Sequence, residues 1–145
     1  MIHCRNAYDD VIEILKDYKE RLSEGEIGDY KPETLRGNCH FFAGTIEHAK
    51  DFLDMNFTLS FTGVITFAEE YRELVKYVPL EFMHAETDSP YVAPVPFRGK
   101  RNEPNYVTKV INRIADIKEE SFDDVERQLI ENANRLFDLN KYDFL

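Results

Sequence analysis

Short strand-like segments alternate with amphipathic helix-like segments along this chain, and a further helix follows the last pair. The strand-like segments are IH at 2–3, GNCHFF at 37–42, FTLSFTG at 57–63 and LEFMHAET at 80–87. Strands separated by helices call for a parallel sheet with right-handed crossovers, so the order predicts an α/β fold. We expect four parallel strands, the fourth ending near Thr87, with the helices on one face.

The helices are marked by apolar periodicity and by residues typical of helix ends. Apolar residues recur at helical spacing over 7–22, and Thr45 is placed to cap a short helix. FAEEYRELVKYV, at 67–78, is expected to be a helix that ends at Pro79. A helix is expected to start near Pro104, and Ser121 opens the last one with a capping-box-like SFDD.

Composition limits the class of protein. The chain has 145 residues, 43% hydrophobic and 13% aromatic, which favours one packed domain over 1–145. A formal net charge of -10 argues against general binding to duplex DNA, and RGKR, at 98–101, is the one basic cluster. No run approaches the ~20 apolar residues of a membrane span. The two cysteines do not make a disulfide framework, which is typical of a reduced compartment. We therefore expect a cytoplasmic protein that makes no membrane contact.

Three side chains suited to metal binding follow the predicted strands. His3 ends the first strand, His40 ends the second, and Asp88 follows the fourth in ETDSP. The carboxyl ends of parallel strands carry the sites of α/β folds, and imidazole with carboxylate suits a divalent ion of the zinc or manganese type. A lone histidine in a strand is more often structural, but three such residues at one end of a sheet favour a site.

The other histidines and the cysteines are predicted to be structural. His48 faces a helix surface, and His84 lies in the middle of a strand. Cys4 follows His3 and Cys39 precedes His40, and side chains alternate across a strand. If the histidines point to the site, the cysteines point to the helices and belong to the core.

Several stretches of the chain resemble one known family. IHCRNA, GNCHFFAGT and FTLSFTGVITF resemble its fifth, sixth and seventh strand motifs. AETDSPYVAPVPFRGKRNEPNYV is a close match to its eighth strand and following loop, and IENANRLF resembles its terminal helix. The family is that of the TatD metal-dependent hydrolases, TIM barrels of the amidohydrolase-like group that are associated with deoxyribonuclease activity.

The resemblance implies half of the family fold. Family members begin with four further strands, which carry a His-x-His after the first strand and a metal-bridging Glu after the fourth. The chain resembles the second half: a (βα)4 half TIM barrel with extra C-terminal helices, expected to complete a barrel by homodimerisation. The sheet face opposite the helices, filled by branched side chains in a full barrel, would be open to water.

The resemblance also implies roles for particular residues. His3 and His40 match metal-ligand histidines, and Asp88 matches the aspartate that contacts the metal and prepares the attacking water. The implied cofactor is a divalent ion (Mg, Mn or Zn). The substrate-binding candidates lie in the loop after the last strand, where the arginines would hold phosphate: Arg98, Arg101, Asn102 and Glu103.

Two positions depart from the family pattern, and one segment repeats a family motif in another place. Phe41 and Ala43 stand where the family more often has the Cys and Ser of HCFSG. GEIGDY, at 25–30, echoes the family's GEIGLDY, whose Glu bridges the metals. Here it follows His3 and lies in a polar loop, so Glu26 is not expected to bind metal.

Two functions agree with these observations. The first is a DNase-like, metal-dependent hydrolase of phosphodiester bonds that works as a homodimer. The alternative is a non-catalytic half-barrel subunit or interaction module, because one chain carries too few ligands for the family's two-metal site. Metal content and nuclease activity, with His40→Ala as a control, would separate the two.

Overall fold

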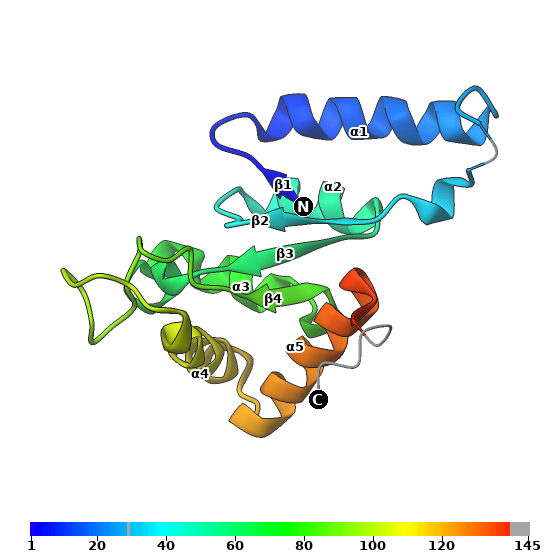
Figure 1. The fold of residues 1–145 in the computed structure, drawn as a ribbon. Coiled ribbons are helices and arrows are strands. Elements are labelled where there is room, and N and C mark those ends of the chain that lie inside the picture. Colours follow the sequence, from blue (N-terminus) through cyan, green and yellow to red (C-terminus); the bar gives the residue numbers. More distant parts are fainter. Residues whose placement is uncertain (29, 140–145) are drawn as a thin grey trace.

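A single parallel sheet of four strands organises the chain. The computed structural model describes residues 1–28 and 30–139. The strands are β1 (Ile2–His3), β2 (Gly37–His40), β3 (Phe57–Phe61) and β4 (Met83–Ala85), and they lie side by side in chain order (Figure 1). All three strand pairs are parallel, which confirms the predicted α/β architecture.

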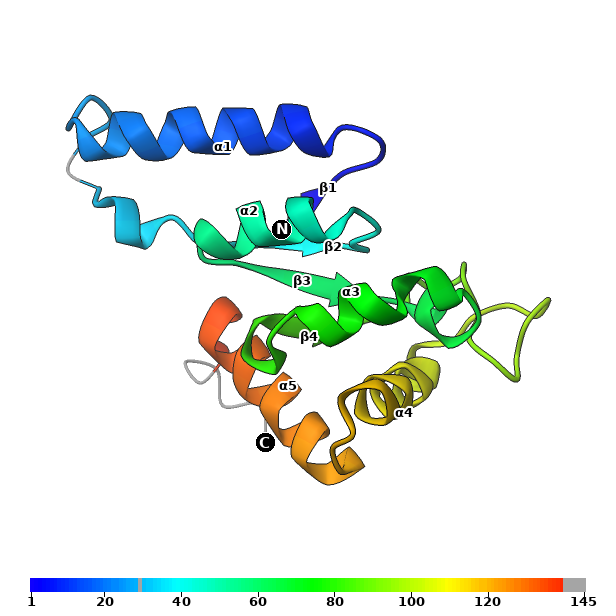
Figure 2. The same ribbon diagram turned by 180° about the vertical axis from the view of Figure 1, so that it is seen from behind.

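The helices lie on one face of the sheet and beyond both of its edges. They are α1 (Tyr8–Ser23), α2 (Ile46–Asp54), α3 (Arg72–Tyr77), α4 (Val107–Lys118) and α5 (Phe122–Phe137). Helices α2 and α3 cover one face, α1 lies beyond β1, and α4 and α5 lie beyond β4 (Figures 1 and 2). None of the helices in 1–28 and 30–139 is both long and apolar enough to cross a membrane.

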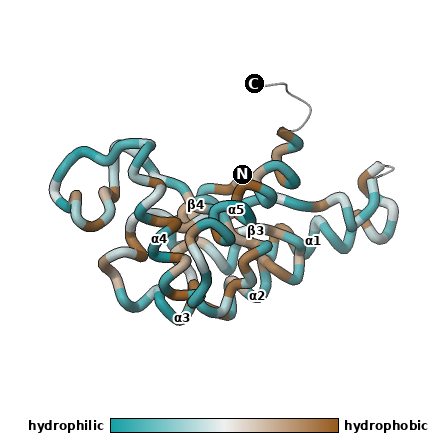
Figure 3. The backbone as a smooth tube through the Cα atoms, turned by 90° about the horizontal axis from the view of Figure 1, so that it is seen from below, coloured by the Kyte–Doolittle hydropathy of each residue, from teal (hydrophilic) through white to brown (hydrophobic). Residues whose placement is uncertain are grey.

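The core lies between the sheet and the helices on its covered face. Leu59, Phe61 and Met83 point to this side and are at most 1% exposed. They pack in one cluster with side chains of α2, α3 and α4. Figure 3 shows α2 and α3 together on one side of the strands, while the end of α5 rises on the other. Cys4 and Cys39 belong to this cluster, as predicted from side-chain alternation.

The opposite face of the sheet carries small polar side chains instead of the branched apolar ones of a barrel interior. Thr58 lies at its centre and bonds to its neighbours: Asn38 donates to Thr58 Oγ1 at 3.1 Å, and His84 Nε2 lies 3.0 Å from the same oxygen. Ser60 donates to Asn38 Oδ1 at 2.9 Å. All four residues are at most 7% exposed, so this part of the face is a closed hydrogen-bonded network and not a surface open to water.

Several elements are shorter than the sequence predicts. The strand-like segments 37–42 and 57–63 are strands only over Gly37–His40 and Phe57–Phe61. The segment 67–78 is helical only over Arg72–Tyr77, and a 3-10 turn at Glu69–Tyr71 precedes it. Its entrance lacks a side-chain cap, because Ala68 stands where a Ser, Thr, Asp or Asn would bond to the first turn. The segment 80–87 forms a strand only over Met83–Ala85, since Leu80–Phe82 turns in a 3-10 helix.

Helix α5 also covers part of the outer edge of β4. Asn132 is fully buried on this helix, and its Nδ2 donates to Leu80 O and Met83 O, both at 2.8 Å. A buried carbonyl without a partner is costly, so Asn132 replaces the strand that would otherwise pair there. Periodicity gave no reason to expect a polar residue on the apolar stripe of this helix.

Candidate metal centre

Two of the predicted metal ligands stand on neighbouring strands. His3 of β1 and His40 of β2 are Cα partners in the parallel ladder, so their side chains point to the same face. Their ring centroids are 5.7 Å apart. The two imidazoles come together because of the register between β1 and β2. A shift of one residue in this register would turn one of them to the helices.

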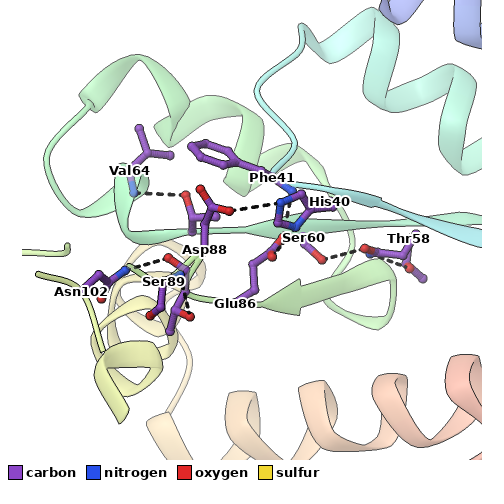
Figure 4. Close-up of polar contacts among 12 residues, drawn as sticks. His40, Phe41, Thr58, Ser60, Val64, Glu86, Asp88, Ser89 and Asn102 are labelled. Carbon is purple, nitrogen blue, oxygen red and sulfur yellow. Dashed lines mark hydrogen bonds and ion pairs between the residues drawn. The ribbon is translucent and has the colours of Figure 1, made fainter. Parts of the chain in front are cut away.

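His40 lies between two carboxylates (Figure 4). Its Nδ1 pairs with Glu86, and its Nε2 is 3.4 Å from Asp88 Oδ1. Glu86 Oε1 also accepts a hydrogen bond of 2.8 Å from the backbone N–H of Phe41. Glu86 thus fixes the ring from one side and leaves Nε2 directed at Asp88.

Glu86 is a site residue that the sequence reasoning did not select. It stands directly after β4, and its backbone N–H extends the ladder by bonding to Phe61 O at 3.0 Å. Its position two residues before Asp88 was a usable signal. Metal-binding histidines commonly donate their second ring N–H to a carboxylate, and the face that carries Asp88 was the place to search for one.

The backbone at the site is held in an uncommon conformation. Phe41 and Asp88 follow β2 and β4 with φ values of 48° and 54°, in the left-handed region that non-glycine residues rarely occupy. Such residues cluster at functional sites. Both occur where the chain leaves a strand and turns across the carboxyl edge of the sheet.

A close approach between two loops supports this edge. A Cβ added at Gly63, after β3, would lie 2.3 Å from Val92 O in the Pro-rich loop. Only glycine allows the backbones to meet at this distance. The loop that follows Asp88 is therefore packed directly against the end of β3.

Asn102 holds the same loop from within. Its Nδ2 donates to Thr87 O at 2.7 Å and Tyr91 O at 2.6 Å, and it also lies 3.3 Å from Val92 O. Its Oδ1 accepts from Glu103 N at 2.9 Å, and the residue is 2% exposed. These contacts position the turn that carries Asp88. The part expected of Asn102 in substrate binding stays a prediction.

The other loop candidates lie at the surface. Arg98 is exposed, donates to Ala93 O at 3.0 Å and stacks over the Phe67 ring at 3.7 Å. Arg101 and Glu103 are also exposed, and their side chains make no hydrogen bond or ion pair within the described part of the chain. The guanidinium of Arg101 can therefore bind an anion, whereas that of Arg98 already contacts Ala93 and Phe67.

The donors present fit part of a metal site. Two ligands at about 2.1 Å from one tetrahedral ion lie about 3.4 Å apart, which is the separation of His40 Nε2 and Asp88 Oδ1. Ser89 Oγ, next to Asp88, is buried without a partner among the described residues. However, no three His, Cys, Asp or Glu side chains in 1–28 and 30–139 converge closely enough to hold an ion. The chain supplies a pair of donors, with His3 beside them.

The remaining histidines have structural partners. His48 Nδ1 accepts from Thr45 N at 3.2 Å in a capping box at the start of α2, and its Nε2 lies 3.1 Å from Asp9. His84 belongs to the buried polar network.

Cys39 and Glu26 also have no part in the candidate site. Burial raises the pKa of the Cys39 thiol to about 12, so it stays protonated and is no nucleophile. Glu26 pairs with Arg21 at 3.3 Å.

Comparison with known proteins places this arrangement in a family. The family described as TatD related DNase matches residues 1–138. An uncharacterized metal-dependent hydrolase of Bacillus subtilis, YabD, is 43% identical over 97% of this chain and 51% of its own length. The Escherichia coli homologue YcfH is 35% identical over 97% of this chain and 49% of its own.

Solved structures agree. The TatD homologue YJJV of Escherichia coli superposes with a TM-score of 0.78 at 25% identity, over 94% of this chain and 48% of that one. A hydrolase of the TatD family from Entamoeba histolytica gives a TM-score of 0.75 at 20% identity, over 92% and 48%. The chain spans about half the length of each of these relatives. This chain therefore belongs to the TatD family of metal-dependent hydrolases and corresponds to about half of its homologues' length.

Proposed function

We propose that this chain provides half of the active site of a metal-dependent phosphodiesterase that acts on DNA. The observation that carries the proposal is the placement of His40, fixed by Glu86 on Nδ1 and directed at Asp88 through Nε2. Membership of the family described as TatD related DNase supports a phosphodiester substrate. A homodimer is the form in which we expect the chain to act.

Each residue has a distinct task in this proposal. In the homodimer, His40 and Asp88 of one chain, joined by a His3, would hold a divalent ion. The chemistry that such an ion supplies is polarisation of the phosphodiester and a lower pKa for nearby water. Asp88 orients the attacking water and accepts its proton, and Glu86 holds the His40 ring in the tautomer that leaves Nε2 free. Arg101, exposed and unpaired in the described structure, holds a phosphate oxygen.

One observation favours a second candidate, a half-barrel module without catalysis. The described residues bring together fewer than three donors for an ion. A partner chain, whether a second copy or a separate first half, would then have to complete any site. The two candidates differ in one measurable property, the metal content of the purified chain in its native assembly.

The test is to measure metal per chain by mass spectrometry and hydrolysis of a bis-aryl phosphodiester and of single-stranded DNA with added Mn²⁺, Mg²⁺ or Zn²⁺. We expect bound metal and metal-dependent hydrolysis, and we expect His40→Ala to abolish both. Glu86→Gln should lower metal affinity or activity by between about 10- and 100-fold, the usual effect of losing a carboxylate that orients a ligand histidine.

Glu81→Gln is the matched control, because Glu81 is exposed and lies before β4, away from the carboxyl edge. It should bind metal and hydrolyse substrate like the unaltered chain. A folded protein that binds no metal and cleaves neither substrate would refute the enzyme and favour the module. Equal losses in Glu86→Gln and Glu81→Gln would refute the role of Glu86.

A further inference from the structure

A cavity of about 310 Å³ adjoins the candidate metal centre on the side of His3. The segments that follow the first three strands line it at the carboxyl edge of the sheet. They contribute His3 and Arg5, then Phe41 and Ala43, then Val64 and Tyr71. Its volume is at the lower end of the range of small-molecule sites, which run from about 300 to 1,000 Å³.

The walls of the cavity are aromatic, and two of the rings are fixed. Tyr8 accepts a hydrogen bond of 2.9 Å from Ala43 N, and its ring stacks on His48 at 5.2 Å. Phe41 packs edge-on against His40, with 6.2 Å between ring centroids and 89° between planes. A flat aromatic ligand can stack on such rings with little loss of side-chain entropy.

The charge of the cavity differs from that of the chain. The protein has 28 acidic against 18 basic residues, yet the residues lining this cavity include Arg5 and no carboxylate. Arg5 is exposed, and its side chain makes no hydrogen bond or ion pair with any residue that the structure describes. Burial raises the pKa of Tyr8 to about 12, so its phenol stays neutral. The cavity thus suits a ligand that is both aromatic and anionic.

The same cavity collects the two residues of the loop after β2 that depart from the family pattern. Phe41 and Ala43 both line it, where the family motif more often has Cys and Ser. A ring in place of a thiol and a methyl in place of a hydroxyl make the wall more apolar and more suited to stacking. Phe41 and Ala43 therefore add to the apolar, aromatic character that the other residues give this cavity.

We propose that this cavity binds one nucleotide of the substrate, with its base against Phe41 and Tyr8 and its phosphate near Arg5. His3 lines the cavity and stands beside His40, so a nucleotide seated here places an adjoining phosphodiester at the candidate metal centre. The inference rests on the proposed function, because it names part of that substrate. Binding, unlike hydrolysis, does not need the metal.

The test is calorimetric titration of the metal-free full chain, in excess chelator, with thymidine 5′-monophosphate, thymidine and inorganic phosphate. We expect the nucleotide to bind more tightly than either fragment. Phe41→Ala should weaken nucleotide binding by about tenfold, the usual effect of removing one stacking ring. Arg5→Gln should weaken binding of the nucleotide and leave binding of thymidine unchanged.

Tyr30→Ala is the control, because the Tyr30 ring is 70% exposed and does not line the cavity. Circular dichroism confirms that each variant is folded, and Arg5→Gln, at an exposed position, tests the site if Phe41→Ala does not fold. No nucleotide binding by the folded chain, or equal weakening by Phe41→Ala and Tyr30→Ala, would overturn the proposal. Hydrolysis with no nucleotide binding would leave the proposed function standing and reject the cavity.

Discussion

One buried side chain, His84, makes the stability of the fold depend on pH. It is 7% exposed, and its Nε2 meets Thr58 Oγ1 at 3.0 Å in the polar network. Burial, assisted by the positive charge of Arg135, lowers the pKa of its imidazole from 6.5 to about 4. The folded protein therefore holds this side chain neutral at pH values where the unfolded chain would protonate it.

The consequence is acid sensitivity between pH 6.5 and pH 4. Because the unfolded state binds the extra proton, the contribution of neutral His84 is fully present above pH 6.5 and is lost as the pH falls towards 4. The loss amounts to about 3 kcal/mol in the free energy of unfolding. Urea unfolding at pH 7, 5.5 and 4 should show this decline, and His84→Gln should show less of it; identical pH profiles for both proteins would contradict the prediction.

The site residues were predictable to different degrees. His3, His40 and Asp88 could be selected because each follows a strand, and parallel strands bring their carboxyl ends to one edge. Glu86 was missed because its partner, His40, lies 46 positions earlier and is reached only through the register of three strands. Residues that act through such long-range pairing leave little local signal in a sequence.

At the scale of elements, the Pro-rich loop after β4 depends on one asparagine. Asn102 donates to three backbone carbonyls of the turn around Asp88, and its backbone N–H adds a bond of 3.0 Å to Pro90 O. A loop with few hydrogen bonds of its own is thereby fixed on the edge of the sheet. The position of Asp88 relative to His40 depends on this arrangement.

Asn102→Asp should therefore destabilise the fold and displace Asp88. The change replaces an amide donor by a carboxylate oxygen that faces three carbonyls, which should lower the free energy of unfolding by about 2–4 kcal/mol. Asn105→Asp adds the same charge at an exposed position without a side-chain partner in the described structure, and should have little effect. Urea unfolding and metal affinity of both variants test this; equal stability of the two would contradict it.

Helices whose first residue is preceded by a capping side chain begin where the sequence predicts, whereas elements without such a residue have other bounds than predicted. Thr45 and Ser121 cap α2 and α5 as predicted, each accepting a bond from a backbone N–H of the first turn. Helix α3 and strand β4 came out shorter than predicted because no capping residue or Gly marks their true limits. The polar face of the sheet was not foreseen, since period-2 patterning identifies a second face but not what covers it.

At the scale of the whole molecule, the two edges of the sheet are unequal. The edge at β1 is a strand of two residues, Ile2–His3, and His3 is exposed. The edge at β4 is largely closed by the chain's own side chains, because Asn132 takes Met83 O and Asn102 takes Thr87 O. Between these two carbonyls only the backbone around Ala85 is left for a further strand.

This inequality bears on how a homodimer would close a barrel. About a twofold axis along the barrel, β1 of one copy would meet β4 of the other, and a two-residue strand matches the short free stretch at Ala85. His3 of the second copy would then stand near Asp88 of the first. The pair of donors in each chain would gain a third ligand, and two centres would share one mouth.

The prediction is a dimer whose metal-dependent activity falls on dilution. Light scattering should give twice the mass of 17.1 kDa, and metal content per chain and specific activity should fall together as the dimer dissociates. Ala85→Pro should yield a folded monomer, because proline removes an N–H on the outer side of an edge strand and spares the β3–β4 ladder. Glu81→Gln, which alters an exposed side chain before β4, should remain dimeric. A monomer that keeps its metal and its full activity through dilution would show that the barrel is not rebuilt from two copies of this chain.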